Sequence, residues 1–473
     1  MGANGISAAL PLDMLRSAQT MEGLHSEAQI LVWLAERISS NKYSVERIPL
    51  NKMSRWVLDG ETGNILHESG NFFRAIGLNI EIGSPIVMKW QQPIILQQEV
   101  GILGFIAKNI NGVLHVLAQA KMEPGNINLV QISPTVQATR SNYLQAHGGK
   151  RPAFVDYFIE PGHGVLLLDQ LHSEQGGRYY RKRNRNVIIQ IDDTEEIDEG
   201  VDFRWVTLGQ LNRLHRIPNT VHLDCRSILG GLIFDLKLDA SIELQIASGS
   251  EVMGSLLCSE KNSNFSMAEI LSWLAGIKVN KKLETKLIEL NKVQNWACDG
   301  NVVRHESGRY FQIIGVDVQA SNREVSSWSQ PLIKNVEGGV LALLMQRKNG
   351  VLHFLIQARL EPGFIDAIEL APTIQYSPTN YVGVTEYDSP AFVEYLKSLD
   401  PEKIYFDGML SDEGGRFYRS EQRHIIAELE GDLRVTLPPE YIWMTLAQIQ
   451  TCARFSCMVN IEFRSLLSCL SFL

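Results

Sequence analysis

Two polar loops at equivalent places in the chain carry side chains suited to binding a nucleotide. The first consists of Thr139, Arg140, Ser141, Asn142 and Tyr143, and the second of Gln375, Tyr376, Ser377, Asn380 and Tyr381. Hydroxyl, amide, guanidinium and phenol groups together match the hydrogen-bonding needs of a pyrimidine base, a ribose and a diphosphate. The alternative is a turn held by local side-chain bonds to the backbone. Because the loop is repeated, we expect it to bind a ligand.

A repeated glycine-rich turn ending in arginine is the second candidate binding element. One copy is Gly176-Gly177-Arg178, and the other consists of Glu413, Gly414, Gly415 and Arg416. Paired glycines allow the backbone to approach a ligand closely, and a guanidinium can hold a phosphate through two hydrogen bonds. A glycine-rich hairpin with a solvated arginine is the alternative interpretation.

Further repeated residues are candidates for stacking and proton transfer. Trp56 and Trp296 stand close to Asp-Gly turns and can stack on a nucleobase, although such a tryptophan can equally anchor a core. Glu123 and Glu361 precede Pro-Gly at strand ends, where a carboxylate can act as a general base or simply face solvent. The other candidate acids and bases are Tyr143, Tyr381, His67 and His305.

Most familiar catalytic signatures are absent from the sequence. It contains no GxxxxGK[ST] phosphate loop, no GxGxxG after a strand, no GxSxG elbow and no HExxH. The six cysteines form no CxxC pair and lie near no histidine at zinc-finger spacing. Hydrolysis by serine, cysteine or a metal is therefore unsupported, and we expect no metal or cofactor.

These candidates recur because the chain is a tandem duplication. His-Glu-Ser-Gly begins at residue 67 and again at 305, and Asn-Gly-Val-Leu-His begins at 111 and again at 349, an offset of 238 residues in both cases. Upstream the offset is 240, as for Trp56 and Trp296. We predict a first module over residues 1–229, a linker over 230–262 and a second module over 263–473.

Local patterns within each copy predict an α+β fold. Ser26-x-x-Gln29 and Ser266-x-x-Glu269 are capping boxes ahead of apolar segments, and Thr207-x-x-Gln210 and Thr445-x-x-Gln448 open a late helix. Asn-Gly pairs at 111 and 349 separate apolar segments and predict β-hairpins. Each module is therefore expected to be a mixed, mostly antiparallel sheet flanked by helices.

Taken together, the repeated blocks resemble the NDP-hexose 2,3-dehydratases over nearly the whole chain. The blocks are His-Glu-Ser-Gly, Trp-x-Gln-Pro, Gln-Ala-[Lys/Arg]-x-Glu-Pro-Gly, Pro-Thr-x-Gln with Asn-Tyr, and Gly-Gly-Arg-x-Tyr. The resemblance implies two tandem Nudix-like modules. No Nudix box is present, which is sensible for an enzyme whose substrate must keep its diphosphate.

The resemblance also implies a reaction and the residues that serve it. The substrate would be a dTDP-4-keto-6-deoxy-hexose, which loses water across C2 and C3 to give a 3,4-diketo-2,6-dideoxy sugar. The C4 ketone acidifies the C3 hydrogen, a base removes it, and the C2 hydroxyl leaves with help from an acid. Matched motifs assign substrate binding to Trp56, the 139–143 loop, Ser173, Trp296, Gln375, Tyr376, Ser377, Asn380, Tyr381 and the 413–416 turn.

Three other functions compete with this one. They are a non-catalytic nucleotide-sugar binding protein, a Nudix-type pyrophosphatase, and a structural dimerising protein. The family resemblance implies a homodimer, and the reactive diketo product implies an NADPH-dependent 3-ketoreductase downstream.

Composition excludes other classes of protein. The net charge of −9 over 473 residues disfavours a nucleic-acid binder. The longest apolar runs are too short to cross a bilayer, and the first residues do not form a secretory signal. We therefore expect a cytoplasmic protein.

Overall fold

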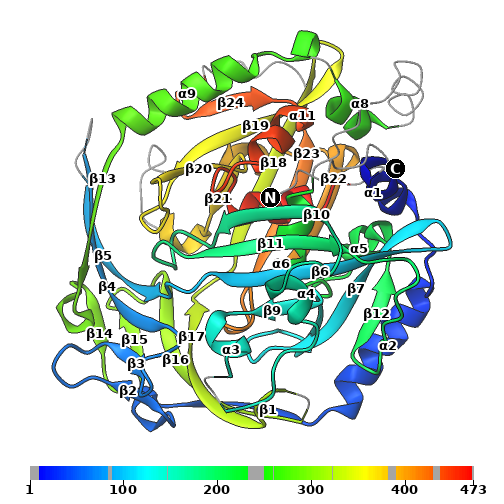
Figure 1. Cartoon of the computed structure of the whole chain (residues 1–473). Coiled ribbons are helices and arrows are strands. Elements are labelled where there is room, and N and C mark those ends of the chain that lie inside the picture. Colours follow the sequence, from blue (N-terminus) through cyan, green and yellow to red (C-terminus); the bar gives the residue numbers. More distant parts are fainter. Residues whose placement is uncertain are drawn as a thin grey trace.

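The computed structural model describes residues 10–83, 88–145, 148–232, 250–258, 260–321, 323–381, 390–429 and 437–470. Within these ranges the chain forms two seven-stranded and two five-stranded sheets with helices packed around them (Figure 1). The predicted α+β class, with mixed, mostly antiparallel sheets flanked by helices, is confirmed. No helix of the described ranges is long and apolar enough to cross a membrane.

Each half of the chain contains one large sheet, and the two large sheets have the same strand order. Each contains a single parallel pair, β6–β11 or β18–β23, among antiparallel neighbours. In the first half the strands are β6 (Gly101–Ile110), β7 (Val113–Met122), β8 (Val130–Ser133), β9 (Val136–Ala138), β10 (Val165–Ser173), β11 (Arg183–Gln190) and β12 (Phe203–Val206). In the second half they are β18 (Gly339–Lys348), β19 (Val351–Leu360), β20 (Ile368–Ala371), β21 (Ile374–Tyr376), β22 (Ile404–Ser411), β23 (Glu421–Glu428) and β24 (Tyr441–Met444).

The predicted Asn-Gly hairpins join β6 to β7 and β18 to β19. Asn111 and Asn349 have φ values of 52° and 51°, and the glycines that follow have 78° and 82°. Two successive positive φ angles are what a two-residue turn between twisted strands requires. The hairpin prediction is confirmed in both halves.

The two small sheets exchange a strand between the halves. β1 (Tyr43–Ile48) pairs with β16 (Phe311–Ala320) of the second half, and β13 (Lys282–Ile288) pairs with β4 (Arg74–Gly83) of the first (Figure 1). The other strands are β2 (Trp56–Leu58), β3 (Ile65–His67), β5 (Met88–Leu96), β14 (Trp296–Cys298), β15 (Val302–His305) and β17 (Ser327–Asn335). Each small sheet therefore contains backbone from both halves of the chain.

Helices enclose the large sheets, and all four predicted capping boxes form. They begin α2 (Glu27–Ser40), α5 (Leu208–Leu214), α9 (Met267–Asn280) and α11 (Leu446–Ala453). α1 (Leu10–Gln19) and α8 (Glu251–Leu257) occupy matching places, because Ser17 and Ser255 donate to the carbonyls of Leu114 and Leu352 at 2.6 Å each. α8 lies in the segment expected as a linker, part of which falls outside the described residues. The remaining α-helices are α3 (Arg140–Tyr143), α4 (Asp156–Ile159), α6 (Leu223–Gly230), α10 (Val393–Lys397) and α12 (Ile461–Leu467).

Two reciprocal turn contacts bring the halves together beside the strand exchange. Gly125 donates its N–H to the Gly414 carbonyl at 2.8 Å, and Arg419 donates to the Gly125 carbonyl at 2.7 Å. The same bonds join Gly363 to Gly176 and Arg181, at 2.8 and 2.7 Å. The Glu-Pro-Gly and Gly-Gly-Arg motifs are thus the two sides of one contact between halves.

Replacing Gly125 with alanine is expected to lower the free energy of unfolding by about 3 kcal/mol. A Cβ atom there would overlap the carbonyl oxygen of Phe417, and backbone on both sides would have to move. Urea denaturation followed by circular dichroism measures the change. The control is Gly276→Ala in α9, where a Cβ meets nothing within 4 Å; it should stabilise the protein by about 0.5–1 kcal/mol. Equal midpoints for the two variants would contradict the prediction.

Candidate active site

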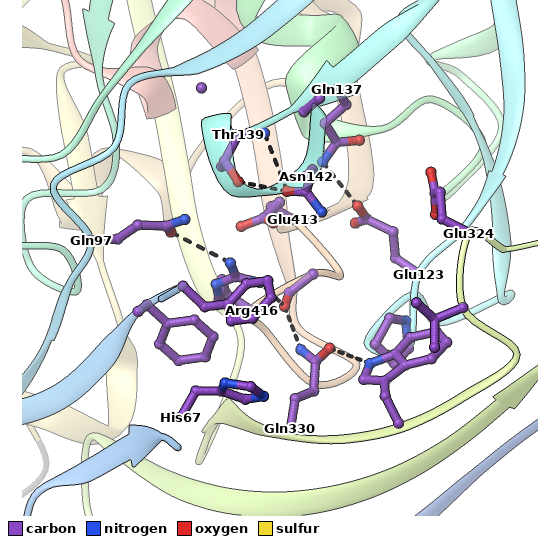
Figure 2. Close-up of a pocket in the computed structure, with 18 of the residues that line it drawn as sticks. His67, Gln97, Glu123, Gln137, Thr139, Asn142, Glu324, Gln330, Glu413 and Arg416 are labelled. Atoms are coloured by element: carbon purple, nitrogen blue, oxygen red, sulfur yellow. Dashed lines mark hydrogen bonds between the residues drawn. The ribbon is translucent and has the colours of Figure 1, made fainter. Parts of the chain in front are cut away.

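A cavity of about 290 Å³ lies where the first large sheet, the small sheet β2–β5 and the 413–416 turn of the second half meet (Figure 2). Both halves contribute to its wall. The polar residues that line it are Ser54, Arg55, His67, Gln97, Lys121, Glu123, Gln137, Thr139, Asn142, Glu174, Tyr179, Lys182, Asn184, Asp224, Arg323, Glu324, Ser327, Ser329, Gln330, Glu413 and Arg416.

Glu123 is a buried carboxylate that opens onto this cavity directly after β7. Its Oε1 accepts a bond from Gln137 Nε2 at 2.9 Å, and its Oε2 lies 2.7 Å from His222 Nε2. Burial opposes ionisation, yet His222, and after it Lys121 and Arg323, lower the pKa of the Glu123 carboxyl group to about 2. The group is therefore a carboxylate at neutral pH.

His222 is fully buried behind Glu123 and caps the N-terminus of α6. Its Nδ1 accepts the backbone N–H of Asp224 at 3.2 Å. Nε2 faces Glu123 Oε2 and donates its proton to it. Burial lowers the pKa of the His222 imidazole, but the charge of Glu123 outweighs burial and raises that pKa above its ordinary value. The helix cap thus orients the ring so that Nε2 meets the carboxylate.

Two further carboxyl groups at the cavity have pKa values raised into the neutral range. Burial, followed by the charge of Glu123, raises the pKa of Glu413 to about 7. Burial and the nearby Asp224 raise the pKa of Glu174 to about 8. Tyr179 donates its hydroxyl proton to Glu413 Oε2 at 2.8 Å. A carboxylate beside two carboxylic acids is the arrangement that divides the roles of base and acid.

Arg416 is the cation that the second half brings to the cavity. Its guanidinium carbon lies 4.2 Å from the centre of the Phe73 ring, and Nη2 lies 3.5 Å from Gln97 Oε1 (Figure 2). Arg416 Nε has no hydrogen-bond partner among the residues described here. Gln330 holds the turn by donating to the Gly415 carbonyl at 2.7 Å and accepts from Trp328 Nε1 at the same distance.

The first polar loop lies at the cavity only in part. Thr139 caps α3 and donates its hydroxyl to Asn142 Oδ1 at 2.5 Å, and both residues line the cavity. Ser141 is turned to Glu99 Oε2 at 2.8 Å, Arg140 is exposed, and Tyr143 packs against an apolar cluster of the large sheet.

Trp56 and His67 also line the cavity, on the side of the small sheet. The two rings contact edge to face, with centroids 5.4 Å apart. His67 Nδ1 lies 2.7 Å from Ser69 Oγ, which fixes the ring. Trp56 packs on Phe73 as well, so it serves the core and the cavity wall together.

The other candidate residues are not part of this cavity lining. Gly414 packs against Asn126 at the contact between the halves. Ser173 donates its hydroxyl proton to Oε2 of the buried Glu369 at 2.5 Å. The second-half candidates occupy the equivalent sequence positions in the other half, where Glu361 pairs with Arg359 Nε at 2.8 Å. They are Trp296, His305, Glu361, Gln375, Tyr376, Ser377, Asn380 and Tyr381.

Sequence analysis missed the charged residues that surround Glu123. They are Lys121, Glu174, Lys182, His222, Asp224, Arg323 and Glu324. One signal was available: the halves differ at these positions, with His222 opposite Asn460 and Lys121 opposite Arg359. Among the described residues, no group of three or more His, Cys, Asp or Glu side chains is placed to hold a metal ion.

Comparison with known proteins places the chain in a family. The family model described as NDP-hexose 2,3-dehydratase matches residues 27–232 and again residues 267–470. A protein of Saccharopolyspora spinosa is 41% identical over 95% of this chain and 92% of its own length, and one of Amycolatopsis orientalis is 39% identical over 96% and 92%. A third, from Streptomyces violaceoruber, is 41% identical over 92% and 95%. Each is named dTDP-4-dehydro-6-deoxy-alpha-D-glucopyranose 2,3-dehydratase. Since the family model covers both halves, the chain belongs to the NDP-hexose 2,3-dehydratase family.

Proposed function

We propose that this chain is a hydro-lyase that removes water across C2 and C3 of dTDP-4-dehydro-6-deoxy-glucose, and that it does so in the cavity around Glu123. The activity named for three relatives that align with more than nine-tenths of the chain supports the reaction. The observation that carries the location is a single cavity in which the pKa of Glu123 is lowered while those of Glu413 and Glu174 are raised.

The proposed chemistry assigns separate roles to these carboxyl groups. Glu123 takes the C3 proton, and the electron pair moves into the enolate of the C4 ketone, next to the cationic Lys121 and Lys182. The enolate then expels the C2 hydroxyl, which leaves as water with the proton of Glu413. The resulting enol takes a proton at C2 and releases the proton of its C3 hydroxyl, which gives the 3,4-diketo-2,6-dideoxy sugar nucleotide.

Nucleotide binding is proposed for the part of the cavity near Arg416. Arg416 is half-buried, and its buried Nε has no hydrogen-bond partner among the described residues, so a diphosphate oxygen can accept from it. Trp56 and Trp328 offer aromatic surface for the base, and Thr139 and Asn142 offer polar groups for the ribose. The corresponding second-half residues, Trp296 and the 375–381 loop, are proposed to hold a second nucleotide-sugar molecule that does not react.

Partners and location follow from the same proposal. The diketo product is reactive, so we propose that an NADPH-dependent 3-ketoreductase consumes it in the same compartment, the cytoplasm. We also propose that the chain works as a homodimer. Size-exclusion chromatography with light scattering tests that state, and a monomeric mass at micromolar concentration would contradict it.

The decisive assay supplies dTDP-4-dehydro-6-deoxy-glucose without added metal, together with a 3-ketoreductase and NADPH as a trap. We expect mass spectrometry to find a trapped product lighter by one water than the directly reduced substrate. A reaction without the chain is the control. Unchanged substrate that still raises the melting temperature would favour a binding protein. Release of dTMP on adding magnesium would favour a pyrophosphatase.

A further inference from the structure

The two halves keep the same glutamate before Pro-Gly but differ in what holds its carboxylate. We propose that His222 is the positioning residue that holds Glu123 for proton removal, and that the lack of its equivalent confines turnover to the first-half cavity. This inference rests on the proposed function.

In the first half the carboxylate is held at both ends. His222 Nε2 binds Oε2 at 2.7 Å, while Gln137 Nε2 binds Oε1 at 2.9 Å. A Cβ placed on Gly415, which lines the cavity, would lie 3.5 Å from Glu123 Oε1. The oxygen that His222 does not bind is therefore the one closest to this part of the cavity wall. It keeps a second lone pair for the substrate's proton.

In the second half, the equivalent glutamate is Glu361, and different side chains bind its carboxylate. Arg359 Nε binds Glu361 Oε1 at 2.8 Å, and Gln375 Nε2 binds the same oxygen at 3.1 Å. Asn460 takes the place of His222, and its Nδ2 donates to Gln375 Oε1 at 3.0 Å. Both bonds therefore fall on one oxygen of Glu361, and its buried Oε2 has no hydrogen-bond partner among the described residues. The Glu361 carboxylate is thus not held at both ends, as that of Glu123 is.

Helix capping alone does not explain the histidine. Asn460 Oδ1 accepts the backbone N–H of Phe463 at 2.9 Å and caps α12 as His222 caps α6. Asparagine thus serves the structural role in this same fold. The imidazole is longer than an asparagine side chain. While Nδ1 caps the helix, Nε2 on the opposite side of the ring can donate to Glu123.

Several other charged groups surround the Glu123–His222 pair and contribute to its pH dependence. The carboxylate and the imidazole are faced by Lys121 on β7, by Asp224 on α6, by Glu413 on the turn after β22, and by Arg323 and Glu324 before β17. Glu174 and Lys182 in turn interact with Asp224. Burial raises the Glu123 pKa, and among the groups that lower it His222 has the largest effect. Removing His222 therefore raises that pKa.

The experiment compares wild type with His222→Asn across pH, using dTDP-4-dehydro-6-deoxy-glucose and the reductase trap. Asparagine keeps a cap of the kind seen at Asn460 but removes the imidazole. We expect kcat at pH 7 to fall by about 10²-fold, the lower end of the range for a general base, with KM nearly unchanged. A base works only when deprotonated, so the acid limb of the kcat profile should move to higher pH, and activity should partly recover as pH rises.

His172→Asn is the matched control. His172 is another buried histidine of the first half, bonded to Gln170 Oε1 at 2.8 Å and not part of the cavity lining. Its variant should keep the kcat and the acid limb of wild type. A His222→Asn variant with wild-type kcat and acid limb would overturn the inference. So would a loss of kcat equal at every pH and accompanied by a lower unfolding midpoint, because that marks a purely structural role. Absence of turnover by wild type would instead overturn the proposed function.

Discussion

Replacing Glu123 with glutamine is expected to lower kcat for dehydration by about 10³-fold, within the range that a general base contributes. Glutamine has nearly the same shape, and its carbonyl oxygen can still accept the bond from His222 Nε2. The amide cannot take a proton from C3. We therefore expect a folded protein with an unchanged unfolding midpoint that binds substrate and does not turn it over.

Two measurements separate loss of the base from loss of the site. The first is trapped product formed per minute by Glu123→Gln and by Glu361→Gln, the same change at the equivalent place in the other half. The second is uptake of deuterium from D₂O at C3 of recovered substrate, which reports proton removal without elimination. Glu361→Gln should keep most of the wild-type kcat. Near-normal turnover or exchange by Glu123→Gln would remove the base from the proposed mechanism.

Features set by a few neighbouring residues were predictable from the sequence. All four capping boxes and both Asn-Gly hairpins form, because each depends on side chains or φ angles within four residues. The duplication helped, since a pattern seen twice is less subject to chance. The exchanged strands were not predictable. β1 and β13 are copies of one sequence element, so pairing within a half and pairing between halves satisfy the same pattern.

The candidate site was likewise predictable only where it depends on short sequence motifs. Glu123, Asn142 and Arg416 were named from their motifs, and the cavity brings them together. That Arg416 and Glu413 line a cavity of the first half could not be predicted, because their placement depends on the Gly125–Gly414 contact between the halves. Lys121 lies within a strand, where alternation predicts only which face it occupies. His222 was not identified from the sequence, because its role depends on a partner 99 residues away.

The interlocked sheets predict that neither half of the chain is a folded monomer when produced alone. A first half ending before residue 250 would keep β4 without β13 and β1 without β16. One apolar cluster beneath the small sheets would also be divided, since it includes Leu50, Trp56, Phe73 and Tyr179 from one half and Leu290, Val293, Phe311 and Phe417 from the other. Unpaired strand edges and exposed apolar surface favour aggregation or association. Chromatography with light scattering tests this, and a compact monomeric half would contradict it.

We expect dehydratase activity to require both halves of the chain, even if each half produced alone forms a dimer with a second copy of itself. Because β1 and β13 are equivalent, two first halves can exchange strands with each other, as in a domain-swapped dimer. In such a dimer Gln175 would stand where Glu413 stands, so the proposed acid would be missing. A pair of second halves would have Asn460 and Arg359 in place of His222 and Lys121. We therefore expect each half alone to lose at least about 10²-fold in kcat, and co-produced halves to regain it. Full activity from a homodimer of first halves would show that Glu413 is dispensable.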